Sequence, residues 1–176
     1  MSLAASGDLL AVSRWINGID RRPPFGFDDG WKDAVLERER PYRAWLKDKL
    51  HRPELAPEGL GYRASFNLPG WAQPVHIAGL DTAWLCGDNA DKGRLLLTEN
   101  QAANHLTTPS GEPLSGLRIV LLHHPFSELA DASSAKRLLA DHADLVLRGH
   151  LHEMKLKLWN GSSLIAVSAN RRRFPL

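Results

Sequence analysis

The chain has 176 residues, of which 43% are hydrophobic and 24% charged, and these values predict one globular domain with a proper core. A net charge of +2 is too small to indicate a nucleic-acid-binding protein, and a single cysteine, Cys86, excludes an internal disulfide. No signal peptide and no run of about 20 apolar residues is apparent, so we expect a cytoplasmic protein that does not contact a membrane.

The N-terminal part of the chain predicts a loop followed by helix. Residues 21–30 are rich in proline and glycine, which is typical of an irregular segment. Residues 33–50 carry apolar side chains near helical spacing among charged ones, which predicts a helix with one buried face. Pro41 is expected to interrupt this stretch or to begin its second helix.

From Gly59 onward the pattern predicts strands and short helices in alternation. Residues 62–68 alternate as a half-buried strand does, and residues 75–85 form a second, mostly apolar strand candidate. A helix is predicted over residues 98–106, with Thr98 as its N-cap and Gln101 placed as in a capping box.

Two short apolar runs further along the chain predict buried strands, at residues 117–122 and 144–147. Between them, residues 133–142 predict a helix capped by Ser133 or Ser134. Residues 155–159 and 163–168 predict a hairpin joined through Asn-Gly. Strands mixed with helices throughout indicate an α/β or α+β fold.

Both buried strands end in histidines. His123 follows the first strand directly, and His150 and His152 follow the second after Gly149, which allows a close backbone approach or a positive φ. The 150 − 123 = 27 residue separation leaves room for one helical crossover between neighbouring parallel strands. Three imidazoles at adjacent strand ends predict a metal site. The other histidines, among them His76 and His105, are expected to be polar residues at the edge of the core.

These residues carry a family resemblance. Leu-Leu-His-His-Pro at 121–125, then a helix, a strand and Gly-His-Leu-His-Glu at 149–153, resembles the last two motifs of the calcineurin-like metallophosphoesterases. Residues 75–101 resemble the middle segment of that family. The resemblance implies a β-sandwich flanked by helices, within a single domain over residues 1–176. Residues 59–176 would form the family-like core and residues 1–58 an atypical N-terminal part.

The resemblance also implies the site and its chemistry. His123 and His150 would bind one divalent metal ion and His152 a second, while His124 would support the ligands. Mn, Fe, Zn or Ni would suit such ligands, with two ions in a complete site. The implied activity is hydrolysis of phosphomonoesters or phosphodiesters by a metal-activated hydroxide. The substrate is a phosphoester of unknown class, with nucleic acid a partner only in that role.

The N-terminal part of the chain lacks most of the motifs that the family has there. No Asp-x-His and no Gly-Asn-His occurs in the chain, while Ser6-Gly7-Asp8-Leu9 resembles the Gly-Asp motif and would make Asp8 a bridging ligand. We therefore expect a chain that is N-terminally truncated relative to the family, or one whose site is completed by a partner chain.

Three alternatives to an active phosphoesterase remain open. The chain could be a catalytically inactive metal-binding or scaffold remnant of the same family, because the first-half motifs are eroded. A metallo-β-lactamase-like hydrolase also uses His-x-His, but Glu153-Met154-Lys155 does not match the residues that such enzymes place next. Residues 171–173 form a basic Arg-Arg-Arg run that could contact nucleic acid, although such a run is more often solvated.

Overall fold

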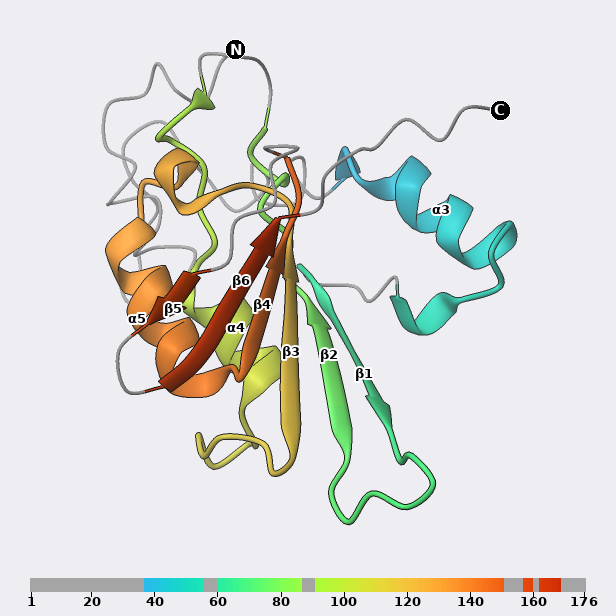
Figure 1. Ribbon diagram of the computed structural model, residues 1–176. Helices are drawn as coiled ribbons and strands as arrows, with labels where there is room; N and C mark the ends of the chain where they lie inside the picture. Colours follow the sequence, from blue (N-terminus) through green and yellow to red (C-terminus); the bar gives the residue numbers. More distant parts are fainter. Residues whose placement is uncertain (1–36, 56–59, 87–90, 151–156, 160–161, 169–176) are drawn as a thin grey trace, which may run out of the picture.

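The computed structural model describes residues 37–55, 60–86, 91–150, 157–159 and 162–168. The strands of these residues form one six-stranded sheet in the order β1-β2-β3-β4-β6-β5 (Figure 1). The inner strands β2, β3, β4 and β6 are parallel, and β1 and β5 pair antiparallel at the two edges. The strands are β1 (Tyr62–Phe66), β2 (Val75–Gly79), β3 (Leu117–Leu122), β4 (Leu145–Arg148), β5 (Lys157–Trp159) and β6 (Ser162–Ser168). The mixed α/β class predicted from the sequence is confirmed.

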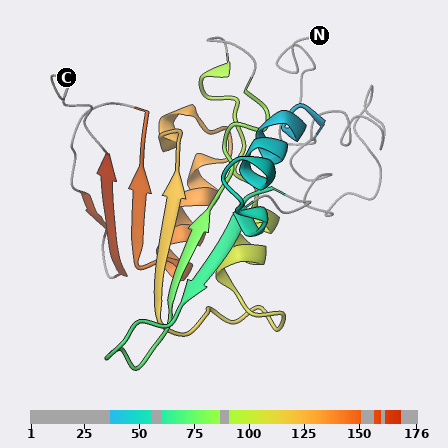
Figure 2. The same cartoon turned by 90° about the vertical axis from the view of Figure 1, so that its right-hand side faces the viewer.

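The helices lie on the two faces of this sheet. α4 (Glu99–Leu106) connects β2 to β3 and α5 (Ala132–His142) connects β3 to β4, and both lie on one face (Figures 1 and 2). α3 (Arg40–Asp48) lies across the opposite side, near the carboxyl ends of the parallel strands (Figure 2). Two short 3₁₀ turns, η2 (Pro53–Leu55) and η4 (Phe126–Glu128), complete the described elements.

The core lies between the sheet and the pair of helices α4 and α5. Ala78, Val120 and Val146 are paired across β2, β3 and β4, and each is fully buried. Leu106 from α4 and Leu139 from α5 are fully buried in the same cluster. This row of small and branched side chains allows the helices to pack closely against the sheet.

The opposite face of the same strands is also apolar. Ile77, Ile119 and Leu145 are in register across β2, β3 and β4, and Leu121 pairs with Leu147 in the next row; all five are only half-buried. Strands that are apolar on both faces are typical of a sheet covered on both sides. The described residues contain no second sheet over this face, so the β-sandwich implied by the resemblance stays a prediction.

Three local expectations differ from the structure. The strand predicted over residues 75–85 ends at Gly79, because the Asp81 carboxylate accepts the Ala83 N–H at 2.7 Å in a turn. Thr98 caps α4 as predicted, but Gln101 donates its amide to the Asp81 and Leu97 carbonyls instead of closing a capping box.

The predicted serine cap of α5 is wrong. Asp131 occupies the N-cap position, and its side chain makes no cap hydrogen bond to its own helix. The carboxylate instead accepts the N–H groups of Leu97 and Thr98 at 3.1 and 2.9 Å. The side chain at the N-cap position therefore bonds to a residue 33 positions earlier in the chain, and not to the first turn of α5 as predicted for a serine cap.

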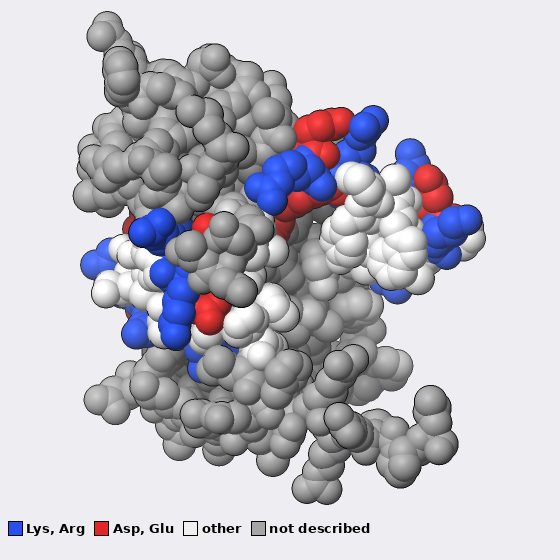
Figure 3. Space-filling view, turned by 90° about the horizontal axis from the view of Figure 1, so that it is seen from above, with Lys and Arg blue, Asp and Glu red and all other residues white. Residues whose placement is uncertain are grey.

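Within the described part of the chain, no helix is long and apolar enough to cross a membrane. Seen onto the carboxyl ends of the parallel strands, the described surface shows basic and acidic side chains close together around α3 (Figure 3). This mixed distribution agrees with the small net charge.

The ion pair between Arg118 and Asp144 joins the starts of β3 and β4 and offers a test of the fold. The Asp144 carboxylate accepts the Arg118 guanidinium at 2.8 and 3.0 Å and its backbone N–H at 2.8 Å. Burial alone would raise the pKa of Asp144, but the hydrogen bonds from Arg118 outweigh it and lower the pKa. Because the folded state favours the ionised carboxylate, this stabilisation is present at neutral pH and is lost in acid.

We expect Asp144→Asn to lower the free energy of unfolding by about 1–2 kcal/mol at pH 7, since the group is partly exposed. The deficit should shrink as the pH falls below about 4, where the unfolded chain takes up the proton, and vanish once the pH is also below the lowered pKa of Asp144 in the folded state. Urea denaturation measures both values. Asp141→Asn is the matched control, since Asp141 is exposed on α5. If Asp144→Asn lowered the free energy of unfolding equally at pH 3 and pH 7, a stabilising role for the ionised pair would be ruled out.

Candidate metal centre and adjoining cavity

The parallel pairing of β3 and β4 brings the predicted histidines together. Leu122 and Arg148 are the last paired residues, and the chain leaves both strands at the same edge of the sheet. His123 follows β3 directly and His150 follows β4 after one glycine. Their Nε2 and Nδ1 atoms lie 3.2 Å apart. The proposed meeting of His123 and His150 at neighbouring strand ends is thus present in the structure.

Gly149 is needed here because the backbone passes close to a ring. Its N–H donates to the Leu122 carbonyl at 3.1 Å, which carries the sheet pairing one residue past β4. A Cβ at this position would lie 3.2 Å from His123 Nδ1, closer than most real contacts. The positive φ of the turn belongs to His150, at 71°, a conformation uncommon for residues other than glycine.

His124 joins the two other rings instead of standing apart from them. One ring nitrogen each from His123, His124 and His150 lies within 4.8 Å of the others. His124 is 5% exposed, and its Nδ1 lies 2.9 Å from Oγ1 of the buried Thr82. Since Nδ1 contacts the hydroxyl, Nε2 is the nitrogen of His124 that is available to bind a metal ion.

The protonation state of His124 suits a ligand. Burial first, and then the neighbouring His123 and His150, lower the pKa of His124, while Glu128 acts in the opposite direction. The net shift keeps the imidazole neutral at physiological pH, and the neutral ring is the form that binds metals.

Glu128 holds His150 from the side opposite His123. Its Oε1, on η4, lies 3.3 Å from His150 Nε2, and its side chain is 14% exposed. A carboxylate in this position favours the tautomer with hydrogen on Nε2, which leaves the Nδ1 lone pair directed toward His123. Neither Glu128 nor Thr82 was predicted from the sequence, since neither belongs to a histidine motif.

The His123 and His150 nitrogens have the spacing of two ligands of one tetrahedral metal ion. With metal–nitrogen bonds of about 2.0–2.1 Å, two ligand nitrogens in tetrahedral geometry are about 3.3 Å apart. The 3.2 Å between His150 Nδ1 and His123 Nε2 meets this requirement without rearrangement. Imidazole ligands suit Zn, Mn, Fe or Ni.

Other predicted site residues lie outside the part of the chain that the structure describes. Asp8, His152 and residues 171–173 belong to this group. His76 and His105 are polar residues at the edge of the core, as predicted: His76 contacts the Ser65 hydroxyl and the Ser115 carbonyl, and His105 contacts the Leu60 carbonyl.

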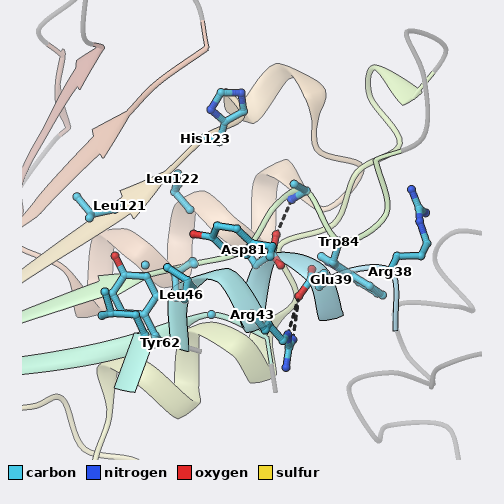
Figure 4. Close-up of a pocket in the computed structure, with 16 residues that line it drawn as sticks. Arg38, Glu39, Arg43, Leu46, Tyr62, Asp81, Trp84, Leu121, Leu122 and His123 are labelled. Atoms are coloured by element: carbon cyan, nitrogen blue, oxygen red, sulfur yellow. Dashed lines mark hydrogen bonds and ion pairs between the residues drawn. The ribbon is translucent and has the colours of Figure 1, made fainter. Parts of the chain in front are cut away.

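A cavity of about 580 Å³ adjoins the histidine cluster (Figure 4). It lies between α3 and the carboxyl ends of β2 and β3, and His123 forms part of its wall. Two carboxyl groups, Glu39 and Asp81, lie together in it. Burial, followed by the hydrogen bond to Glu39 and the charge of Glu39, raises the pKa of Asp81 to about 7. The sequence offered no signal for this carboxyl pair, whose members are 42 residues apart.

No family model matches the chain, and no curated protein matches it.

The carboxyl pair makes a prediction about stability and pH. The pKa of Asp81 is higher in the folded state than in the unfolded state. Its contribution to the free energy of unfolding is therefore fully present below about pH 4 and is lost as the pH rises through 7. We expect wild-type protein to lose about 2–4 kcal/mol of unfolding free energy from this source between pH 4 and 8.

The Asp81→Asn variant cannot ionise and should lack this decline. Asp141→Asn, at an exposed site, should keep the wild-type profile. Urea midpoints at a series of pH values compare the three proteins. Parallel profiles for wild type and Asp81→Asn would contradict proton sharing between Asp81 and Glu39.

Proposed function

We propose that this chain is a metal-dependent phosphoesterase, with one divalent ion held by His123, His124 and His150. The observation that carries the proposal is the approach of His150 Nδ1 to within 3.2 Å of His123 Nε2 at the ends of two parallel strands. The resemblance of residues 121–125 and 149–153 to metallophosphoesterase motifs supports the choice of phosphoesters as substrates.

The residues of the chain have separate parts in this proposal. The three imidazoles bind the ion, Thr82 positions the His124 ring, and Glu128 favours the His150 tautomer whose Nδ1 faces the ion. A bound divalent ion would neutralise phosphate charge and lower the pKa of a water molecule at the site. The anion would then lie beside His123, which also lines the adjoining cavity.

A second candidate is a metal-binding domain without catalytic activity. One observation favours it: the cluster among the described residues supplies three imidazoles, which is a ligand set for one ion with an open position. The paired ions of the resembling family would also need Asp8 and His152 or a partner chain. Metal content and hydrolysis, measured on the same samples, separate the two candidates.

We expect chelator-treated protein to take up at least one Zn²⁺ or Mn²⁺ per chain and to melt at a higher temperature with metal than without. His150→Ala should weaken this binding on the order of 100-fold, because it removes one ligand and leaves the two others. Plasma mass spectrometry after reloading, together with calorimetric titration, measures both effects.

His142→Ala serves as the matched control, since His142 lies at the end of α5 outside the cluster. It should bind metal as the wild type does. The loaded protein should hydrolyse bis(p-nitrophenyl) phosphate, and His150→Ala should not. Metal uptake without hydrolysis would favour the inactive metal-binding domain. Absence of metal from all variants would refute the proposed function.

A further inference from the structure

The cavity beside the histidine cluster has the size and position of a binding site for an organic group. At about 580 Å³ it falls within the range of small-molecule pockets in proteins. His123 and Leu122, at the end of β3, line it together with Asp81, and α3 lies over it (Figure 4). A phosphoester held at the cluster would therefore have its organic part within reach of this cavity.

The walls favour a flat ring. Tyr62 from β1 and Trp84 contribute aromatic surfaces, and Leu46, Leu80 and Leu121 add aliphatic ones. The Tyr62 ring can lie flat on β2 only because residue 79 is glycine: a Cβ there would lie 2.2 Å from Tyr62 Cε1. Apolar surface and a ring face stabilise aromatic ligands by burial and by stacking. The half-buried Tyr62 offers such a face, whereas Trp84 is only 4% exposed and adds mainly apolar wall.

Arg38 and Arg43 balance the charge of the cavity as a whole, so any preference for a cation is local to the carboxyl pair of Asp81 and Glu39. Glu39 is paired with Arg43 at 2.8 Å, whereas Asp81 is hydrogen-bonded to Glu39, which raises the pKa of Asp81, and has no ion pair to a basic side chain among the described residues. A cationic ligand could replace the proton of this hydrogen bond and pair with both carboxylates. The titratable or charged side chains around Asp81 in the cavity are Arg38, Glu39, Tyr42, Arg43, Tyr62 and His123.

We propose that this cavity binds the leaving group of the substrate, and that this group is an aromatic alcohol bearing an ammonium group. The phosphate would lie at the histidine cluster, the ring against Tyr62, and the ammonium group beside Asp81 and Glu39. Calling the aromatic ammonium compound a leaving group rests on the proposed phosphoester hydrolysis. The binding preference itself follows from the cavity.

Metal-free protein and the free amine tyramine test the binding preference directly. We expect tyramine to bind with a dissociation constant of about 1 mM, as is usual for so small a ligand. The neutral analogue 4-ethylphenol should bind at least about tenfold more weakly, because it cannot pair with the carboxylates. Ligand-observed NMR titration measures both. Equal affinity for the two compounds would overturn the assignment of a cation.

Variants separate the cavity from the metal site. Asp81→Asn should weaken tyramine about tenfold, and Leu55→Trp, which places a large ring on the cavity wall, should abolish binding. Leu50→Trp is the matched control, since Leu50 is exposed and does not line the cavity. His150→Ala should bind tyramine as the wild type does. Unchanged binding in Leu55→Trp would place the ligand elsewhere and refute the proposal.

The pH dependence gives a second readout. A cation favours ionised Asp81, so tyramine affinity should rise between pH 6 and 8 in the wild type and stay constant in Asp81→Asn. Failure of tyramine to bind a protein that loads metal and hydrolyses bis(p-nitrophenyl) phosphate would overturn the cavity assignment alone. Tyramine binding by a protein that takes up no metal would leave the cavity assignment standing and remove the proposed function.

Discussion

The in-register parallel pairing of β3 with β4 is the constraint on which the candidate site depends. His123 and His150 are 27 residues apart, and neither α5 nor the loops around it determine their separation directly. The pairing of Leu122 with Arg148 and the Gly149 N–H bond to the Leu122 carbonyl align the two strand ends. A shift of this register by one residue would turn the side chains of one strand to the other face. The histidine that follows the shifted strand would then move away from the other, and their nitrogens would no longer meet.

The register is itself held at the opposite end of the strands. Asp144 accepts both the side chain and the backbone N–H of Arg118, so the start of β4 is tied to the start of β3. Val120 and Val146, paired between the two ends, are fully buried against the helices. The strands are thus aligned by a charged contact at one end and by core packing along their length, and the histidines occupy the end that is free for ligands.

Local patterns in the sequence predicted the parts of the site that depend on single segments. The short apolar runs predicted β3 and β4 to within a residue, and the histidine motifs placed His123 and His150 at their ends. The sequence did not predict the contact of His124 Nδ1 with the Thr82 hydroxyl, because only the folded chain brings the two together. The same reason applies to Glu128, and to Asp131, whose carboxylate bonds to Leu97 and Thr98 instead of capping its own helix. Pairings across 33 or 42 residues leave no periodic trace in the sequence.

The apolar outer face of the sheet links the fold to the selectivity proposed for the site. Ile119, Leu145 and Leu147 are half-buried on this face, so burying it further would stabilise any layer placed against it. Among the described elements α3 lies on this side, and only Leu46 of that helix is buried. A helix with so little buried surface packs loosely, and the cavity between α3 and Leu121 is the result. The proposed metal ligands therefore follow paired strand ends, whereas the proposed leaving-group pocket is closed by the described helix with the fewest buried residues. In the proposed enzyme, substitutions on α3 would change which alcohol is accepted while the histidine cluster stays as it is.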